Sequence, residues 1–388
     1  MDRYFNRRSA LALIAGLIVV PSRVSARALA KNGATPESGA VGAVSLESVA
    51  AGGIAQGLPG VNLLVSFDDG EIHTATAGVS SIELDTPLSL DDRFRIYSIT
   101  KTFTAIITLQ LVEERLITLD DVVPQWLDDA EVLAIQDIQN ISIRQLLTHT
   151  SGIYDYFDDE SPFLTDAFFG PTADWSRVWT PQELLAYAGG SKVTPYFAPG
   201  LGQHYSNSNY ILLGLIIEQA TGNTFATELN TRILDPLELT STAFEGDLPA
   251  VTSTVDGYHL IDAEVLNVTS ANLSWAWTAG GVTSTVGDLA RFADAVFTGS
   301  LLKPDSFNEM FAFEGTSDDV TEGMGVFSVE TPYGQVIGMD GESAGFSSFM
   351  FRIPDAEVTI VALANLAPGG MVFETVRDRT IEWAATRA

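Results

Sequence analysis

Residues 94–114 of the chain read FRIYSITKTFTAIITLQLVEE. The stretch opens with residues of β-type character and continues, from residue 102, into a helical pattern with apolar residues on one face. Ser98 is therefore expected at the N-terminus of a helix, and the three-residue spacing to Lys101 places the hydroxyl and the amine on one face, a turn apart. The helix N-terminus favours developing negative charge, and a lysine held neutral by burial can accept the hydroxyl proton. The pattern predicts a serine nucleophile with a lysine base.

The spacing S-x-x-K occurs a second time, in a different context. Ser300 and Lys303 have the same separation, but Gly299 precedes them and Pro304 follows. A proline at that position prevents a helix from holding the pair on one face. The context therefore favours Ser98 as the nucleophile.

A tyrosine and an asparagine near the middle of the chain form a second candidate element. Tyr205-Ser-Asn207 precedes a strongly apolar helical pattern over residues 210–220, which Gly222 can end. Both residues are expected on a loop between helices. A phenol there can relay a proton to a leaving group, and an amide can hydrogen-bond a substrate. Tyr-x-Asn is common by chance, so it indicates a catalytic site only in combination with Ser98 and Lys101.

Strand patterns lie at both ends of the chain. Near the N-terminus, residues 61–68 and 71–78 are β-type runs separated by Asp69-Gly70, which is a strong hairpin signal. Further runs near the C-terminus that read as strands are residues 323–329, 335–339, 346–353 and 358–366.

Helical patterns fill the region between these strands. A capping box at Ser142 opens one helix, Thr285 opens another, and residues 373–388 form a last helix that can cover the sheet. The sequence therefore predicts an α+β fold, with an antiparallel sheet from both chain ends, flanking helices and a helical lobe inserted over roughly residues 110–300. With no repeat or convincing linker, residues 31–388 are expected to form a single domain.

A competing signature lies near the C-terminus. Gly341-Glu-Ser343-Ala-Gly345 is a literal G-x-S-x-G, the nucleophile elbow of α/β-hydrolases. That fold needs a helix directly after the serine and a histidine further along the chain. Strand-like sequence follows Gly345, and no histidine occurs beyond His259. The elbow interpretation is therefore disfavoured.

Two other groups of side chains are interpreted as structural. His149 is expected near a helix end, in a packing role rather than as a general base. Trp275 and Trp277 could line a pocket, but packing is the default explanation for such aromatics.

The composition excludes several kinds of site. The chain has no cysteine, which removes disulfides, thiolate zinc sites and cysteine nucleophiles. Its four histidines are scattered, and no two have the i, i+4 spacing that binds a metal on one helix face. The formal net charge of −30 disfavours nucleic acid and anionic lipid as partners. A small-molecule or peptide substrate is expected, with no metal and no cofactor.

The first thirty residues read as a targeting segment. Arg3, Arg7 and Arg8 precede an apolar run over residues 10–20, and small residues follow. This run is too short to cross a bilayer core of ~30 Å, which favours a cleaved signal peptide of residues 1–30 over a stable membrane anchor. The paired arginines resemble a twin-arginine signal. The protein is expected to be exported, either to the periplasm or outside the cell.

Four segments together resemble the penicillin-recognising serine hydrolases, the family of secreted DD-carboxypeptidases, class C-type β-lactamases and related esterases. The segments are SITK (98–101), LLTHTSGIYDY (146–156), YSNSNY (205–210) and GGVTS (280–284). They occur in the order that the family shows. The resemblance implies an antiparallel sheet with flanking helices beside a helical lobe, with the site in the cleft between them, which agrees with the predicted fold.

The resemblance also implies roles for individual residues. Ser98 matches the nucleophile, Lys101 its activating base, and Tyr205 the proton relay. Asn207 matches the amide that orients the lysine and the substrate, and the backbone amides of Ser98 and Glu342 match an oxyanion hole. The implied reaction is acyl transfer through a Ser98 acyl-enzyme on esters, amides or D-amino-acid peptides.

One motif departs from the family pattern. Where relatives carry Lys or His, one further residue and Gly, this chain has Met339-Asp340-Gly341, followed by Glu342. A methionine side chain cannot donate the hydrogen bond that helps to hold a substrate carboxylate. D-alanyl-D-alanine carboxypeptidase or class C-like β-lactamase activity therefore stays an alternative, as does a non-catalytic binding protein with the same fold. The sequence leaves open which of Met339 and Asp340 faces the cleft, and it does not set the oligomeric state.

Overall fold

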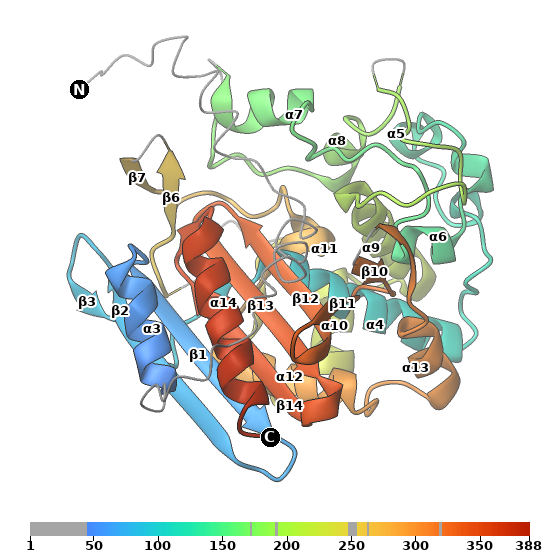
Figure 1. The fold of residues 1–388 in the computed structure, drawn as a ribbon. Helices are drawn as coiled ribbons and strands as arrows, with labels where there is room; N and C mark the ends of the chain where they lie inside the picture. Colours follow the sequence, from blue (N-terminus) through green and yellow to red (C-terminus); the bar gives the residue numbers. More distant parts are fainter. Residues whose placement is uncertain (1–44, 171–172, 191–192, 247–253, 262–263, 318–319) are drawn as a thin grey trace.

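A nine-stranded antiparallel sheet forms the centre of the fold (Figure 1). Its strand order is β3-β2-β1-β14-β13-β12-β11-β10-β9. The predicted signal peptide, residues 1–30, lies outside the described residues. The structure, a computed structural model, describes residues 45–388 apart from 171–172, 191–192, 247–253, 262–263 and 318–319.

The strands divide into one large and two small sheets. The large sheet contains β1 (Gly60–Phe67), β2 (Ile72–Ser81), β3 (Thr86–Pro87), β9 (Glu314–Ser317), β10 (Val320–Glu322), β11 (Phe327–Thr331), β12 (Gly334–Ser343), β13 (Phe346–Ile353) and β14 (Val358–Ala364). One small sheet contains β15 (Leu366–Ala367), β6 (Tyr258–Ile261) and β7 (Glu264–Asn267), and the other contains β4 (Phe94–Arg95), β8 (Val282–Ser284) and β5 (Ala243–Phe244).

The two ends of the chain meet in the large sheet. β1 pairs antiparallel with β14, with Val61 opposite Ala364 and Phe67 opposite Val358. Every residue of β14 is buried, and its nearly continuous apolar sequence suits a strand that is covered on both faces. The predicted α+β fold, with an antiparallel sheet from both chain ends, is confirmed.

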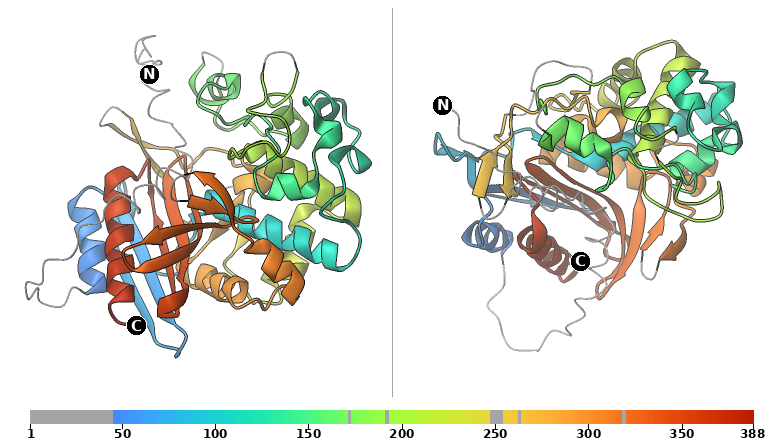
Figure 2. Two further views of the ribbon diagram at one scale, coloured as in Figure 1. Left: turned by 45° about the vertical axis from the view of Figure 1, so that its right-hand side comes forward. Right: turned by 90° about the horizontal axis from the view of Figure 1, so that it is seen from above.

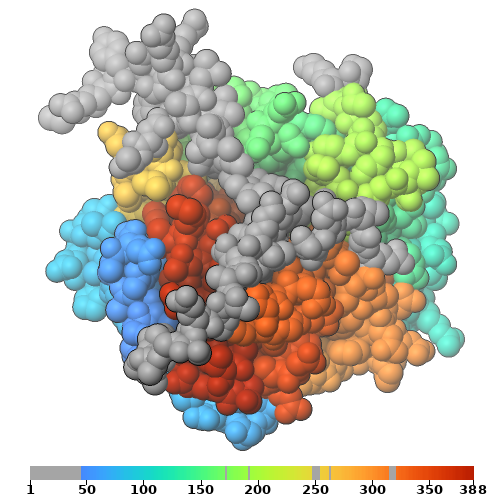
Figure 3. All heavy atoms as spheres, viewed as in Figure 1, coloured from blue at the N-terminus to red at the C-terminus, as the bar shows by residue number. Residues whose placement is uncertain are grey.

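Helices cover both faces of this sheet. α3 (Leu46–Ala55) and α14 (Gly370–Ala385) lie side by side on one face, blue and red in the space-filling view (Figure 3). On the other face, α12 (Val286–Phe297) packs against β1, β13 and β14. The Thr285 hydroxyl accepts the backbone N–H of Asp288, which is the helix start that the sequence predicted.

A helical lobe lies beside the sheet (Figure 2). Its two central helices, α4 (Thr100–Glu113) and α9 (Asn207–Thr221), pack against each other and are buried over most of their length. Among the residues that the structure describes, no helix is long and apolar enough to span a membrane. The other helices are α5 (Ala130–Leu133), α6 (Ile143–Leu147), α7 (Pro162–Leu164), α8 (Pro181–Leu185), α10 (Phe225–Leu229), α11 (Trp277–Gly280) and α13 (Pro304–Met310). The single-turn 3-10 and π segments are η1 (Tyr97–Ile99), η2 (Val123–Gln125), η3 (Ile138–Asn140), η4 (Thr165–Phe169), η5 (Asn230–Leu234) and η6 (Pro354–Ala356).

One predicted strand is partly wrong. The sequence predicted a strand over residues 323–329, but β11 begins only at Phe327. Gly325 has a φ of +72°, which breaks the extended conformation, and its carbonyl accepts a hydrogen bond from Thr102 Oγ over 2.7 Å. The stretch before β11 is therefore a loop that is hydrogen-bonded to α4.

Candidate active site

Ser98 lies between the short strand β4 and helix α4. It is the middle residue of η1, a single turn that runs directly into α4 at Thr100. The preceding Tyr97 has a φ of +43°, a conformation that a residue with a side chain keeps only where the surrounding structure holds it. Here the Tyr97 hydroxyl donates to the Ala344 carbonyl over 2.6 Å. The turn fixes Ser98 directly before the helix that carries Lys101.

Lys101 is fully buried, and its nitrogen contacts three oxygens. Nζ lies 3.0 Å from Ser98 Oγ, 2.8 Å from Asn207 Oδ1 and 2.7 Å from the Ala279 carbonyl. The amide and carbonyl oxygens can only accept, so a neutral amine donates both of its N–H groups to them and directs its lone pair at Ser98 Oγ. Burial lowers the pKa of Lys101 to about 7, against the opposing effect of the Asp155 carboxylate. The amine can therefore act as a base near neutral pH.

Tyr205 contacts the same hydroxyl. Its phenol donates to Ser98 Oγ over 2.7 Å, and its ring centroid lies 4.8 Å from Lys101 Nζ. Burial raises the pKa of the Tyr205 phenol well above its ordinary value. The phenol thus keeps its proton in the pH range where the lysine loses one. Of the two groups, the lysine suits the role of base and the tyrosine that of proton donor.

Asn207 is the first residue of α9, and the expected position on a loop is wrong. The preceding Ser206 is extended, with a φ of −146°, and the helix starts directly after it. The polar first turn of α9 masked the helix start, because the apolar pattern begins only at Tyr210. This position directs the Asn207 amide at Lys101.

A buried carboxylate that the sequence analysis did not single out completes this network. Asp155 Oδ2 accepts from Asn207 Nδ2 over 2.9 Å, and Oδ1 accepts from the backbone N–H of Phe157 over 3.0 Å. Burial raises the pKa of Asp155 to about 6. The available signal was its place in LLTHTSGIYDY, but no spacing rule connects that segment to Lys101.

Strand β12 brings Gly341 against the nucleophile turn. A Cβ atom on Gly341 would lie 2.2 Å from the Ile96 carbonyl oxygen and 2.8 Å from the Ser98 backbone nitrogen. Neither backbone atom can move aside cheaply. The close approach therefore requires glycine, and the next residue, Glu342, lines the same pocket as Ser98.

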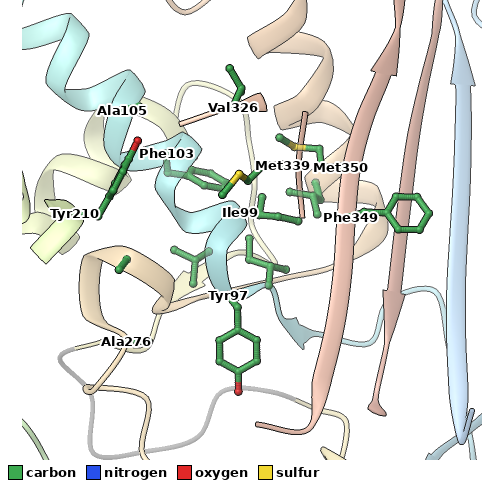
Figure 4. Packing of buried hydrophobic residues seen from close by; sticks show 14 of the residues in the cluster. Tyr97, Ile99, Phe103, Ala105, Tyr210, Ala276, Val326, Met339, Phe349 and Met350 are labelled. Carbon is green, nitrogen blue, oxygen red and sulfur yellow. The ribbon is translucent and has the colours of Figure 1, made fainter. Parts of the chain in front are cut away.

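The directions of Met339 and Asp340 follow from strand pairing. Met339 stands opposite Met350, is 2% exposed and packs in the apolar core beside α4 (Figure 4). Asp340 stands opposite Phe349 and so points to the other face of the sheet. Its charge still acts on Lys101, where it opposes the dominant effect of burial on the lysine pKa.

The Glu342 side chain turns away from Ser98. Its Oε2 accepts from Ser347 Oγ and from the backbone N–H of Gly369, each over 2.8 Å. Burial raises the pKa of this carboxyl. Glu342 can therefore serve the site through its backbone, whereas its carboxylate ties β12 to the start of α14.

A pocket with aromatic walls opens beside Ser98. The rings of Phe157 and Trp275 stack with centroids 4.6 Å apart, so Trp275 both packs and lines the pocket, which the packing explanation alone missed. Met339 does not line it. The lining residues are Tyr97, Ser98, Tyr156, Phe157, Asn207, Trp275, Ala276, Ala279, Gly280, Glu342 and Ser343.

Comparison with known proteins agrees with this geometry. The model of the beta-lactamase family matches residues 46–382. The chain belongs to the beta-lactamase family. The resemblance to penicillin-recognising serine hydrolases is thereby confirmed.

Relatives within and near this family have several activities. Penicillin-binding protein 4* of Bacillus subtilis is 26% identical over 295 residues, which are 72% of this chain and 62% of that protein. The chain thus spans about three fifths of the length of such curated relatives. A D-stereospecific amidohydrolase from Streptomyces sp. is 32% identical, with a TM-score of 0.75, over 86% of this chain and 96% of that one. The D-amino acid amidase of Ochrobactrum anthropi is 25% identical, with a TM-score of 0.72, over 87% and 99%.

The competing candidates do not form a second nucleophile site in the described part of this member of the beta-lactamase family, although Ser343 lines the pocket beside Ser98. Ser343 ends strand β12, and strand β13 follows it after a turn, so the helix that a nucleophile elbow requires is missing at this point. The His149 Nδ1 accepts from the backbone N–H of Ser206 over 3.1 Å in a buried position. Ser300 precedes α13, which begins after Lys303. Over the described part of the chain, no cluster of three or more His, Cys, Asp or Glu could hold a metal.

Proposed function

We propose that this chain is an exported serine hydrolase that transfers acyl groups through a covalent intermediate on Ser98. The observation that carries the proposal is the pair of short contacts to one hydroxyl, from Lys101 Nζ at 3.0 Å and Tyr205 OH at 2.7 Å. Burial lowers the pKa of Lys101 and raises the pKa of Tyr205, so the lysine suits the role of base and the tyrosine that of acid.

Acylation follows from these contacts. Neutral Lys101 takes the Ser98 proton as Oγ attacks the substrate carbonyl, and the backbone N–H groups of Ser98 and Glu342 receive the oxyanion. When the tetrahedral intermediate collapses, Tyr205 donates its proton to the leaving amine or alcohol and regains one from Lys101. The products of this half-reaction are the acyl-enzyme and the free leaving group. Water then attacks the acyl carbon, its proton returns through the same pair, and Ser98 is released.

For the substrate, we propose esters and amides of D-amino acids. Support comes from the similarity to the Streptomyces amidohydrolase and the Ochrobactrum amidase, and from the aromatic pocket, which suits an apolar acyl side chain. A D-alanyl-D-alanine carboxypeptidase is the second candidate, which the similarity to a penicillin-binding protein favours. The Met339-Asp340-Gly341 segment disfavours it, because Met339 packs in the core and the segment supplies no cation to hold a terminal carboxylate.

We also propose that the protein acts outside the cytoplasm. The support is the arginine-rich start of residues 1–30 and the short apolar run that follows it. Mass spectrometry of the protein recovered from the periplasm or the medium tests this, since cleavage should leave a mature N-terminus near Lys31.

Turnover of D-phenylalanine amide and L-phenylalanine amide, measured on the wild type and on Ser98→Ala, tests the substrate class. The D-amide should be hydrolysed faster by the wild type, and the variant should release no ammonia above background while its melting temperature stays unchanged. A protein that binds these amides without hydrolysing them would instead be a binding protein with the family fold.

A further inference from the structure

A buried carboxylate is joined to the proposed base by one amide. Lys101 Nζ donates to Asn207 Oδ1 over 2.8 Å, and Asn207 Nδ2 donates to Asp155 Oδ2 over 2.9 Å. Asp155 is 7% exposed and Lys101 is fully buried. A carboxylate and an amine that becomes positive when it takes up a proton are thus linked inside the protein, where water screens charge little.

The carboxylate determines which end of the amide faces the lysine. An amide has one accepting oxygen and one donating nitrogen, whereas an ionised carboxylate only accepts. Asp155 therefore takes the nitrogen end of Asn207, and the oxygen end is left for Lys101. If the amide turned over, its N–H groups would face the lysine N–H groups, and the lone pair of the neutral amine would no longer be directed at Ser98.

We infer that Asp155 is a positioning residue for the Lys101 base, which fixes the Asn207 amide and supplies a buried negative charge that favours the protonated form of Lys101. The inference rests on the proposed function, in which Lys101 is the base. Asp155 itself touches neither Ser98 nor the place of the reacting carbonyl, because Asn207 stands between.

Other groups also act on Lys101, and they set the background for this effect. The carboxylates of Glu322 on β10 and Asp340 on β12 raise the pKa of Lys101, as Asp155 does, while burial lowers it more strongly. The phenol rings of Tyr205 and Tyr210 lie 4.8 Å and 5.7 Å from the nitrogen. The Asp155 carboxylate is connected to the lysine by the two hydrogen bonds that Asn207 makes.

A second set of groups surrounds Asp155. The Tyr196 hydroxyl accepts the backbone N–H of Asp155 over 3.3 Å and donates to the Asp158 carboxylate over 2.7 Å. Asp158 therefore lies in the same loop, but its route to Lys101 runs through the Tyr196 hydroxyl and the backbone N–H of Asp155, and its own carboxylate does not contact the Asn207 amide. This makes Asp158 a matched control.

The test measures how fast a neutral fluorophosphonate modifies Ser98 between about pH 5 and pH 9. Asp155→Asn keeps the size of the side chain and an acceptor for Asn207, but removes the charge. Because the charge favours the protonated lysine, its loss should move the acid limb of the rate profile to lower pH by about one unit. Asp158→Asn should leave the limb where the wild type has it.

Asp155→Ser, which is smaller and also neutral, guards against misfolding of the first variant and should move the limb in the same direction. All rates are measured well below the lowest melting temperature among the wild type and the variants. The inference would be overturned if either folded Asp155 variant had its acid limb at the same pH as the wild type, or at a higher pH. A wild type that is never modified at Ser98 would instead refute the proposed function, so the two failures are distinguishable.

Discussion

Replacing Gly341 by alanine tests whether the contact between β12 and the nucleophile turn matters for catalysis. The new Cβ would lie 2.2 Å from the Ile96 carbonyl oxygen and 2.8 Å from the Ser98 backbone nitrogen. Ordinary van der Waals contact of a Cβ atom begins at 3.4 Å, so β12 and the turn must separate by about 1 Å. Such overpacking costs about 1–3 kcal/mol of stability.

The same displacement moves the Glu342 backbone N–H away from the oxyanion position. A donor placed about 2.9 Å from the oxyanion would retreat to about 3.9 Å, which is too far for a hydrogen bond. Loss of one oxyanion donor costs about 3 kcal/mol of transition-state stabilisation, so kcat should fall roughly 100-fold. The Ser98 hydroxyl and the lysine would still be present.

The assay is kcat and kcat/KM for a p-nitrophenyl ester, with the melting temperature measured on the same preparation. The matched control is Gly287→Ala in α12, where a Cβ would meet no atom within 4 Å. This control should keep full activity and gain about 0.5–1 kcal/mol of stability, because alanine is the better helix former. If Gly341→Ala kept kcat within threefold of the wild type, the close approach of β12 would play no part in catalysis.

Three further outcomes are expected. Because burial lowers the pKa of Lys101 to about 7 and the base works only when neutral, kcat/KM should rise with pH through that value, and a flat profile between about pH 5 and pH 8 would argue against a lysine base. Lys101→Met and Tyr205→Phe should each lower kcat by several orders of magnitude, and the double variant should lose little more, since the two residues act as one proton-transfer unit. If the losses in kcat were additive in the double variant, the two residues would act independently. Because the Met339-Asp340-Gly341 segment supplies no cation for a substrate carboxylate, kcat/KM for p-nitrophenyl butyrate should exceed that for benzylpenicillin, and the reverse order would require another cation at the site.

Local patterns in the sequence predict most of the fold. Turns and helix caps depend on one or two residues, so short stretches of sequence predict them. Examples are the Asp69-Gly70 hairpin, the cap at Thr285 and the helix end at Gly222. The break before β11 escaped prediction because it depends on Gly325, whose carbonyl is bound by Thr102 from a distant helix. Such a tertiary contact leaves no local signal.

The candidate site divides in the same way. The S-x-x-K spacing identifies Ser98 and Lys101, since both lie within one turn of chain. Asp155 reaches Lys101 only through Asn207, and no sequence rule connects three segments so far apart. The direction of Met339 also depends on pairing with β13, which fixes the face only once the register is known.

The central claim is that Ser98 is an activated nucleophile, and intact-protein mass spectrometry after exposure to a fluorophosphonate tests it most directly. The wild type should gain the mass of one phosphonyl group, and peptide mapping should place it on Ser98. Ser98→Ala should gain none, whereas Ser343→Ala should still be labelled at Ser98. A wild type that gains no mass, or a label that maps to Ser343, would contradict the account.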